Sequence, residues 1–204
     1  MSAKEKSVVI TSALRTAIGT FNGMLKNMQG HDLGSIVVKE NVKKSQLKPN
    51  DIDEVIMGQV LISASGQNPA RQAAIQAGIP IEKTAYIVNQ VCGSGLRSVA
   101  AGYQSIISDD SKIIVAGGQE SMTNAPHGIH FRNNEKLEEV NLIDTMIKDG
   151  LWDAFNGYHM GITAENVATK WQITRKEQDI FALSSQIKVE KAQKDGKFKN
   201  EIVP

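Results

Sequence analysis

Cysteine is almost absent from this 204-residue chain, which has a single one, Cys92. One thiol forms no intrachain disulfide and no cysteine-rich metal site, so a reducing compartment is expected. No apolar run approaches the roughly 20 residues of a membrane span, and residues 1–6 lead into a predicted strand rather than a signal-peptide core. The formal net charge of +1 provides no general attraction to nucleic acid or to an anionic membrane. We therefore predict a cytoplasmic protein with neither kind of partner.

Strand-type and helix-type segments alternate along the first 116 residues. Apolar, β-branched runs predict strands at 7–11, 55–62, 84–91 and 112–116. Helical spacing of apolar residues predicts helices at about 31–46, between Asn68 and Gly78, and after Cys92. In the second of these, Asn68 is expected to cap the helix and Pro69 to occupy its first position. The helix after Cys92 is expected to bury Leu96, Val99, Ala100, Tyr103, and Ile106 or Ile107. The alternation predicts an α/β fold with a mainly parallel, mixed sheet and helices on both faces.

Cys92 lies between the predicted strand at 84–91 and the helix that follows, with Gly93 and Gly95 beside it. In parallel sheets the working residues gather at the carboxyl ends of strands, and a helix start stabilises the negative charge of a thiolate. Glycines let the backbone bend sharply and let another group approach closely. The position favours a nucleophile. The alternative is a buried structural thiol, the commoner role of a lone cysteine.

The pattern changes after Met122. Residues 124–141 have little periodicity, and then Thr174 and Glu177 have the spacing of a capping box at the start of a helix that continues to Lys194. His127 and His130 are three residues apart, but no third ligand lies near, so no metal site is predicted. The glycine pair at 117–118 lacks the remaining pattern of a nucleotide-binding loop. Ser94 lacks the flanks of a serine hydrolase nucleophile and is interpreted as a helix-start residue.

Residues 89–96 read Asn-Gln-Val-Cys-Gly-Ser-Gly-Leu, which resembles the active-site motif of the thiolase family. Enzymes of this family make or cleave 3-ketoacyl-coenzyme A. The resemblance continues in family order through segments 15–19, 66–72, 117–122, 149–153, 158–161 and 163–166. It therefore depends on much more than one cysteine.

The resemblance implies roles for particular residues. Cys92 matches the cysteine that carries the acyl group, and its backbone N–H matches part of an oxyanion hole. His159 matches a histidine at the pantetheine end of coenzyme A, and Met160 matches a methionine that lines the acyl pocket and favours short acyl chains. Leu151, in the neighbouring matched segment, is also assigned to substrate binding. The expected partner is acetyl-CoA or a short-chain acyl-CoA. The coenzyme A thioester is a substrate, and no cofactor is expected.

The resemblance also implies a domain arrangement. Residues 1–122 match an N-terminal core domain without its last strand, and residues 123–204 match part of an inserted loop domain. The C-terminal half of the family is absent, together with its Gly-His-Pro histidine, its oxyanion-hole asparagine and its second cysteine. Three interpretations follow, in order of preference. The chain is an incomplete gene product, it works with a separate chain that carries the second half, or it is a non-catalytic acyl-CoA-binding or assembly subunit.

The last expectation concerns association. Without the last strand and the second half, an apolar surface and a strand edge are left uncovered. Family members form dimers and tetramers, which implies a homo-oligomer or association with the missing C-terminal half. The segment 124–141 is the candidate assembly loop.

Overall fold

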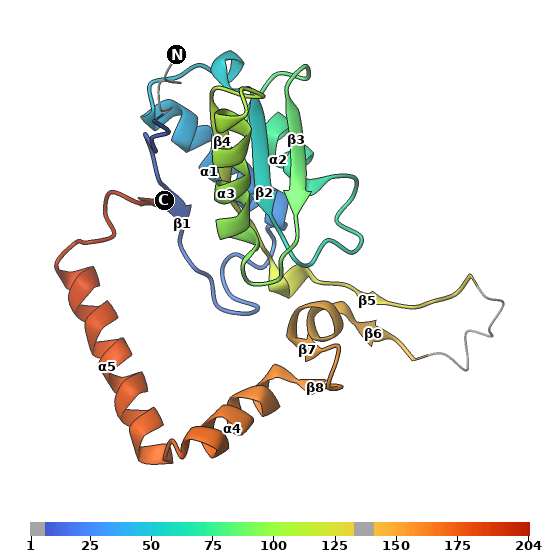
Figure 1. The fold of residues 1–204 in the computed structure, drawn as a ribbon, viewed down its shortest axis with the longest axis vertical. Coiled ribbons are helices and arrows are strands. Elements are labelled where there is room, and N and C mark those ends of the chain that lie inside the picture. Colours follow the sequence, from blue (N-terminus) through green and yellow to red (C-terminus); the bar gives the residue numbers. More distant parts are fainter. Residues whose placement is uncertain (1–6, 133–140) are drawn as a thin grey trace, which may run out of the picture.

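A parallel sheet of three strands forms the centre of the computed structural model, which describes residues 7–132 and 141–204 (Figure 1). The first part of the chain forms β1 (Arg15–Thr16), α1 (Gly30–Lys44), β2 (Glu54–Gly58), α2 (Pro69–Gln76), β3 (Thr84–Val88), α3 (Ser94–Ile107) and β4 (Ile114–Gly118), with short 3-10 helices at Pro49–Asp51 and Met122–Asn124. The strand order in the sheet is β3–β2–β4. The predicted α/β class is confirmed.

The central strand β2 is buried along its whole length, with Val55 and Ile56 fully inaccessible to solvent. Its apolar run fits a parallel strand that is covered on both faces. In the register of the sheet, Gly58 at the carboxyl end of β2 lies opposite both Val88 of β3 and Gly118 of β4. The three strands therefore end at the same edge.

Helices cover both faces of the sheet. Helices α1 and α2 pack against each other on one face, and α3 lies on the other against β2 and β4 (Figure 1). The start of α2 follows the sequence prediction, because the side-chain oxygen of Asn68 accepts a hydrogen bond from the N–H of Arg71 at 3.1 Å and Pro69 occupies the first helical position. The predicted ends of the strands were less accurate, since β2 and β3 stop before residues 62 and 91.

The predicted buried face of α3 is wrong. Leu96 is 78% exposed and Tyr103 is 54% exposed, whereas the buried residues of the helix are Ser94, Ser98 and Gly102. These small residues recur every four positions, so they form one stripe of the helix. A small-residue stripe lets the helix backbone approach the sheet closely, and the apolar side chains are left on the outer face.

The predicted strand at 7–11 is also wrong. In the part of the chain that the structure describes, this segment has no ladder partner, and Val9 and Ile10 are exposed. A cavity of about 450 Å³ lies between residues 8–14 and β4, with α1 and α3 as its other walls. The segment has strand-forming residues, but among the described residues no strand lies in register with it to form a ladder.

The second part of the chain extends away from the sheet. It forms β5 (His127–Gly128), β6 (Ile143–Asp144), a π-helix η4 (Met146–Leu151), β7 (Trp152–Asp153), β8 (Tyr158–His159), α4 (Met160–Trp171), α5 (Arg175–Lys194) and β9 (Ile202–Val203). The β5–β6 pair projects to one side of the sheet, and α4 and α5 form a bent arm (Figure 1). The capping box of α5 at Thr174 and Glu177 is confirmed. Residues 133–140 of the predicted assembly loop lie outside the described residues.

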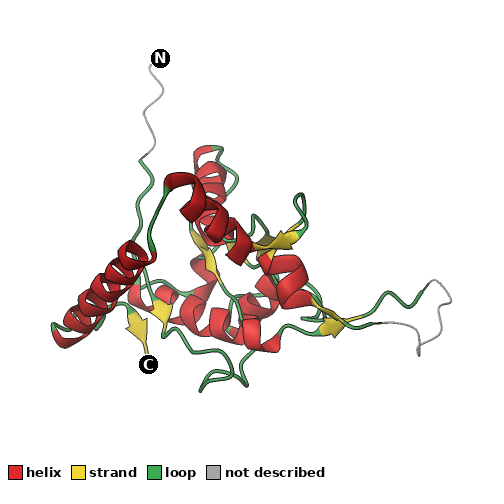
Figure 2. Ribbon diagram, turned by 90° about the horizontal axis from the view of Figure 1, so that it is seen from below, coloured by secondary structure: helices red, strands yellow, loops and turns green. Residues whose placement is uncertain are grey.

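The arm returns to the sheet domain at its far end. Strand β9 pairs in parallel with β1, and Figure 1 places the C-terminus beside β1. In Figure 2 the C-terminus likewise lies next to short strands, drawn in yellow. The Arg15 guanidinium donates a hydrogen bond to the Glu201 carboxylate at 2.9 Å, and the Lys44 ammonium donates to the backbone carbonyl of Asn200 at 2.8 Å. The domain division at residues 122 and 123 stays a prediction.

The amino-terminal ends of β2 and β4 are joined by one carboxylate, that of Asp53. Its Oδ2 atom accepts hydrogen bonds from the N–H groups of Lys112 at 2.8 Å and Ile113 at 3.1 Å, and the Lys83 ammonium lies 3.6 Å from Oδ1. These backbone donors hold the pKa of Asp53 below its usual value of 3.8, and the N–H of Lys112 has the largest effect. The ionised form is therefore bound more tightly in the folded state than in the unfolded state.

We predict that Asp53→Ala lowers the free energy of unfolding by about 1–2 kcal/mol at neutral pH, because two backbone donors lose a charged acceptor. A lowered folded pKa gives stability that is present above 3.8 and is lost as the pH falls through the folded value. The difference between variant and wild type should therefore shrink on acidification. Urea unfolding at a series of pH values measures it, and a difference independent of pH would contradict the prediction.

Candidate functional site

Polar side chains follow each strand at the carboxyl edge of the sheet. Gln59 comes directly after β2, Asn89 after β3 and Gln119 after β4. Because the preceding residues lie in register, these positions are neighbours in space. The edge is the usual location of ligand sites in open α/β sheets.

Cys92 is exposed on the tight turn between β3 and α3. The N–H of Gly93 donates to the carbonyl of Gln90 at 3.0 Å, and the N–H of Ser94 donates to the carbonyl of Val91 at 3.1 Å. Val91 has a positive φ of 48°, a conformation that is costly for a β-branched residue. The predicted position of Cys92, after a strand and at the start of a helix, is confirmed.

Three glycines hold this turn against the ends of the strands. A Cβ atom at Gly58 would lie only 2.3 Å from the carbonyl carbon of Ser94 and 2.5 Å from the nitrogen of Gly95. A Cβ atom at Gly118 would lie 3.3 Å from the Cα atom of Gly95. The first turn of α3 therefore packs backbone against backbone on the carboxyl ends of β2 and β4, and no side chain at Gly58 is compatible with this contact.

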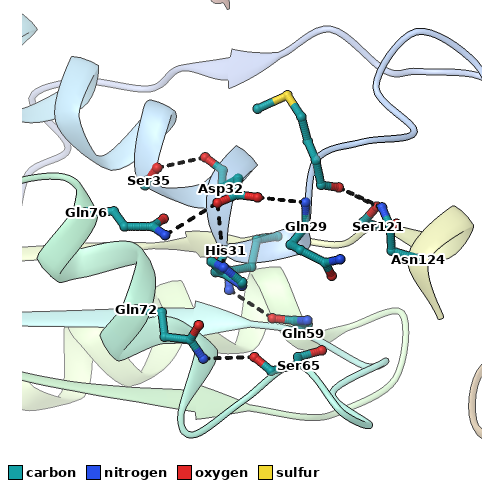
Figure 3. A network of polar contacts seen from close by, with 12 residues as sticks. Gln29, His31, Asp32, Ser35, Gln59, Ser65, Gln72, Gln76, Ser121 and Asn124 are labelled. Carbon is teal, nitrogen blue, oxygen red and sulfur yellow. Dashed lines mark hydrogen bonds and ion pairs between the residues drawn. The ribbon is translucent and has the colours of Figure 1, made fainter. Parts of the chain in front are cut away.

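A polar network surrounds the same edge on the side of α1 and α2 (Figure 3). The amide of Gln119 donates to the side-chain oxygen of Gln59 at 2.8 Å, and the Gln59 amide donates to the carbonyl of Leu61 at 3.1 Å. Both glutamines are buried. At the start of α1, Asp32 accepts hydrogen bonds from the N–H of Gln29 at 2.9 Å and from the amide of Gln76 at 3.4 Å. The first pair of hydrogen bonds joins the segments that follow β2 and β4, and the second joins the start of α1 to the end of α2.

Glu120 holds the segment that follows β2. Its carboxylate accepts hydrogen bonds from the N–H of Val60 at 2.8 Å and of Leu61 at 3.3 Å. Burial raises the pKa of Glu120 above its usual value of 4.5, although these two backbone donors act in the opposite direction. The carboxylate thus keeps the 60–61 backbone in place at the cost of partial desolvation.

A short hairpin gathers the residues predicted to bind substrate. Trp152 of β7 lies opposite His159 of β8, so Leu151, which precedes Trp152, comes close to His159 and Met160. Gly150, which precedes Leu151, lies near the segment that follows β2, because a methyl group at Gly150 would be 3.4 Å from Cδ2 of Leu61. The segment fixed by Glu120 therefore supports the segment that carries Leu151.

His159 also serves as the N-cap of α4. Its Nδ1 atom accepts a hydrogen bond from the N–H of Gly161 at 3.0 Å, which leaves Nε2 directed away from the helix backbone. Met160 is 44% exposed and Leu151 is half-buried. Within residues 7–132 and 141–204, no hydrogen bond or ion pair joins this group to Cys92, and no group of three metal-ligating side chains could hold a metal ion.

Comparison with known proteins connects this arrangement to a family. A family model described as the N-terminal domain of thiolase matches residues 8–204. The chain belongs to the thiolase family. The resemblance carried by residues 89–96 is thereby confirmed.

Similar proteins extend the comparison. The acetyl-CoA acetyltransferase of Rhizobium meliloti (strain 1021) is 60% identical over 198 residues, which is 97% of this thiolase chain and 50% of that protein. The cytosolic acetyl-CoA acetyltransferase of Rattus norvegicus is 52% identical over all 204 residues and 51% of its own length. The structure of Acat5 thiolase from Ascaris suum in complex with coenzyme A matches with a TM-score of 0.91 and 38% identity, over 95% of this chain and 50% of that one. The chain thus spans about half the length of these relatives.

Some residues of the site were missed by the sequence analysis. Ser94 was interpreted only as a helix-start residue, and Gly58, Gln119 and Glu120 received no role. A glycine inside an apolar strand run is a known sign of close backbone approach, so the role of Gly58 was predictable. The contact between Glu120 and Val60 depends on the register of β2 and β4, which no local pattern in the sequence indicates.

We predict that Glu120→Gln makes stability less dependent on pH. A folded pKa raised by burial gives stability that is complete below 4.5 and is lost as the pH rises through the folded value. Glutamine stays neutral and keeps an oxygen for the N–H of Val60, so the free energy of unfolding of the variant should fall less between pH 4.5 and neutrality. Parallel curves for variant and wild type in denaturant titrations would show that Glu120 is not the titrating group.

Proposed function

We propose that this chain is the acyl-accepting half of an acetyl-CoA acetyltransferase. The Sγ atom of Cys92, as thiolate, attacks the carbonyl carbon of acetyl-CoA, and the coenzyme A thiolate leaves. The acetyl group is then held on Cys92 as a thioester and is transferred to the α-carbon of a second acetyl-CoA, which gives acetoacetyl-CoA. The reverse reaction is thiolysis by coenzyme A.

The exposed thiol of Cys92 on a strained turn at the start of α3 carries this proposal. The turn occupies the carboxyl edge of a parallel sheet, where donors at a helix start stabilise developing negative charge. We assign one of these donors, the N–H of Cys92, to the oxyanion hole on the basis of the family resemblance. The choice of acetyl as the acyl group is supported by the acetyl-CoA acetyltransferases among the relatives.

We assign substrate binding to the hairpin group of Leu151, His159 and Met160. Because Nδ1 of His159 accepts the N–H of Gly161, the neutral imidazole carries its proton on Nε2 and offers it to the pantetheine end of the substrate. The flexible side chains of Met160 and Leu151 form the apolar wall for a short acyl group. Binding of coenzyme A to the Ascaris suum relative supports a coenzyme A thioester as ligand.

The complete condensation requires groups beyond this sequence. Removal of a proton from the second acetyl-CoA needs a base, and the resemblance assigns that role to the second cysteine of the other half. Catalytic groups that act as a unit lose most of their effect when separated, so we expect the isolated chain to stop at the acyl-cysteine. We place its activity in the cytoplasm by similarity to the cytosolic rat relative.

A second candidate is a non-catalytic acyl-CoA-binding or assembly subunit that pairs with a chain carrying the C-terminal half. The outward apolar face of α3, with Leu96 and Tyr103 exposed, favours a partner that covers it. The two candidates differ in one measurable step, the transfer of an acetyl group to Cys92.

We predict that incubation with acetyl-CoA adds the mass of one acetyl group to Cys92. Intact-mass spectrometry measures the adduct, and peptide mapping assigns it. Cys92→Ala should lack this adduct. Any acetylation that remains on the variant is on other side chains, such as lysines, and is subtracted. The experiment is repeated with the C-terminal half of the Rhizobium meliloti relative added in excess. Coenzyme A affinity without any adduct on Cys92 in both arms would favour the binding subunit.

We further predict that the chain self-associates through the outer face of α3, because Leu96, Val99 and Tyr103 are exposed at helical spacing and form an apolar stripe that a second copy would cover. Light scattering at micromolar concentration should give a mass above the 22.2 kDa of one chain. Leu96→Asp should shift the population toward monomer, and Gln104→Asp on the same helix is the matched control. A monomeric wild type with a cooperative thermal melt would contradict this prediction.

A further inference from the structure

The hydroxyl of Ser94 connects the two sides of the turn that carries Cys92. Ser94 is only 4% exposed. Its Oγ atom accepts a hydrogen bond from the N–H of Gln90 at 2.8 Å and donates one to the carbonyl of Val91 at 2.6 Å. Gln90 and Val91 precede the cysteine and Ser94 follows it, so a single side chain closes the loop around Cys92.

The same contacts maintain an unfavourable backbone conformation. Val91 has a φ of 48°, and a β-branched residue persists there only when its surroundings over-determine it. Its N–H donates to the side-chain oxygen of Asn89 at 3.0 Å, and its carbonyl accepts from both the hydroxyl and the N–H of Ser94. Both backbone polar groups of Val91 are therefore satisfied in this conformation, which sets the backbone direction at the next residue, Cys92.

Ser94 can impose this conformation because its own position is fixed. Its backbone packs on Gly58, where an added Cβ atom would lie 2.3 Å from the Ser94 carbonyl carbon. Gly95, the next residue, contacts Gly118 of β4. The backbone of Ser94 is therefore held by the strands, and its hydroxyl holds the residues that precede Cys92.

We infer that Ser94 is a positioning residue for Cys92: it holds Val91 in the left-handed conformation and thereby fixes the backbone of Cys92 in the turn at the carboxyl edge of the sheet. The inference rests on the proposed function, in which Cys92 is the acyl acceptor. It adds a role for a serine that has no contact with the substrate in that proposal.

The chain contains a matched control on the same helix. Ser98 lies one turn after Ser94 and is fully buried. Its single hydroxyl proton is shared between the carbonyl oxygens of Gly95 at 2.7 Å and Gly117 at 2.6 Å from Oγ. It is as well buried as Ser94, but among the described residues no hydrogen bond joins its side chain to residues 89–92. A purely structural role predicts the same behaviour for alanine variants of both serines.

The test compares Ser94→Ala, Ser98→Ala and Asn89→Ala in the full 204-residue chain. Alkylation by iodoacetamide, in which the Cys92 thiolate displaces iodide, is followed by intact mass across a pH series. Amide hydrogen exchange of residues 89–93 is measured on the same samples, and thermal melts establish that each variant is folded. Asn89 is exposed, so its variant keeps the fold even if Ser94→Ala does not.

We expect exchange at residues 90 and 91 to become roughly fivefold faster or more in Ser94→Ala, as for the loss of one hydrogen bond. Alkylation of Cys92 should become roughly tenfold slower, with Asn89→Ala changed in the same direction. Ser98→Ala should change the melting temperature alone. Equal alkylation rates and pH profiles for the two serine variants, or an unchanged rate in Asn89→Ala, would overturn the positioning role. Absence of an acetyl adduct on the wild type would overturn the proposed function without affecting this comparison.

Discussion

The backbone contact between the first turn of α3 and the carboxyl ends of β2 and β4 determines much of the remaining structure. Gly58, Gly95 and Gly118 remove every Cβ atom from this contact, so main-chain atoms of the helix meet main-chain atoms of the strands. The stripe of Ser94, Ser98 and Gly102 continues it along the helix. A contact of this kind tolerates almost no displacement, since cores are packed as densely as organic crystals. Cys92 lies two residues before Ser94, so this backbone contact also restricts the movement of the turn that carries Cys92.

The same edge of the sheet also determines where the segment that we propose to bind substrate lies. Glu120 fixes Val60 and Leu61 through their N–H groups, and Leu61 meets Gly150 beside Leu151. The buried pair of Gln59 and Gln119 joins the ends of β2 and β4 beneath these contacts. Polar groups therefore arrange a site whose proposed ligand contacts are mainly apolar. The contacts of Glu120 are directional hydrogen bonds, which fix geometry more sharply than hydrophobic packing alone, whereas Oε1 of Gln119 is buried without a hydrogen-bond partner among the described residues.

Local patterns in the sequence were sufficient for elements whose cause is local. The apolar run of β2, the Asn68 cap of α2 and the capping box at Thr174 were predicted, and Cys92 was found from its glycine flanks and the family motif. The prediction of a strand at 7–11 was wrong because β-branched residues favour an extended conformation but do not specify a neighbouring strand to pair with. The prediction of the buried face of α3 was wrong because it assumed that the apolar side chains of the helix point toward the sheet. The close approach of the helix backbone to the sheet instead requires small residues on that face. The role of Glu120 depends on strand register, a property of the assembled sheet.

The pairing of β1 with β9 has a consequence for how the molecule is assembled. The hydrogen bond between Arg15 and Glu201 joins residues 186 positions apart, and the strands beside it contribute only two residues each. Closing so long a loop carries an entropy cost that grows with the logarithm of its length, and only a few contacts offset it. The helical arm therefore docks last and opens first, so the end of the chain can leave β1 while the β3–β2–β4 sheet and the turn at Cys92 stay intact.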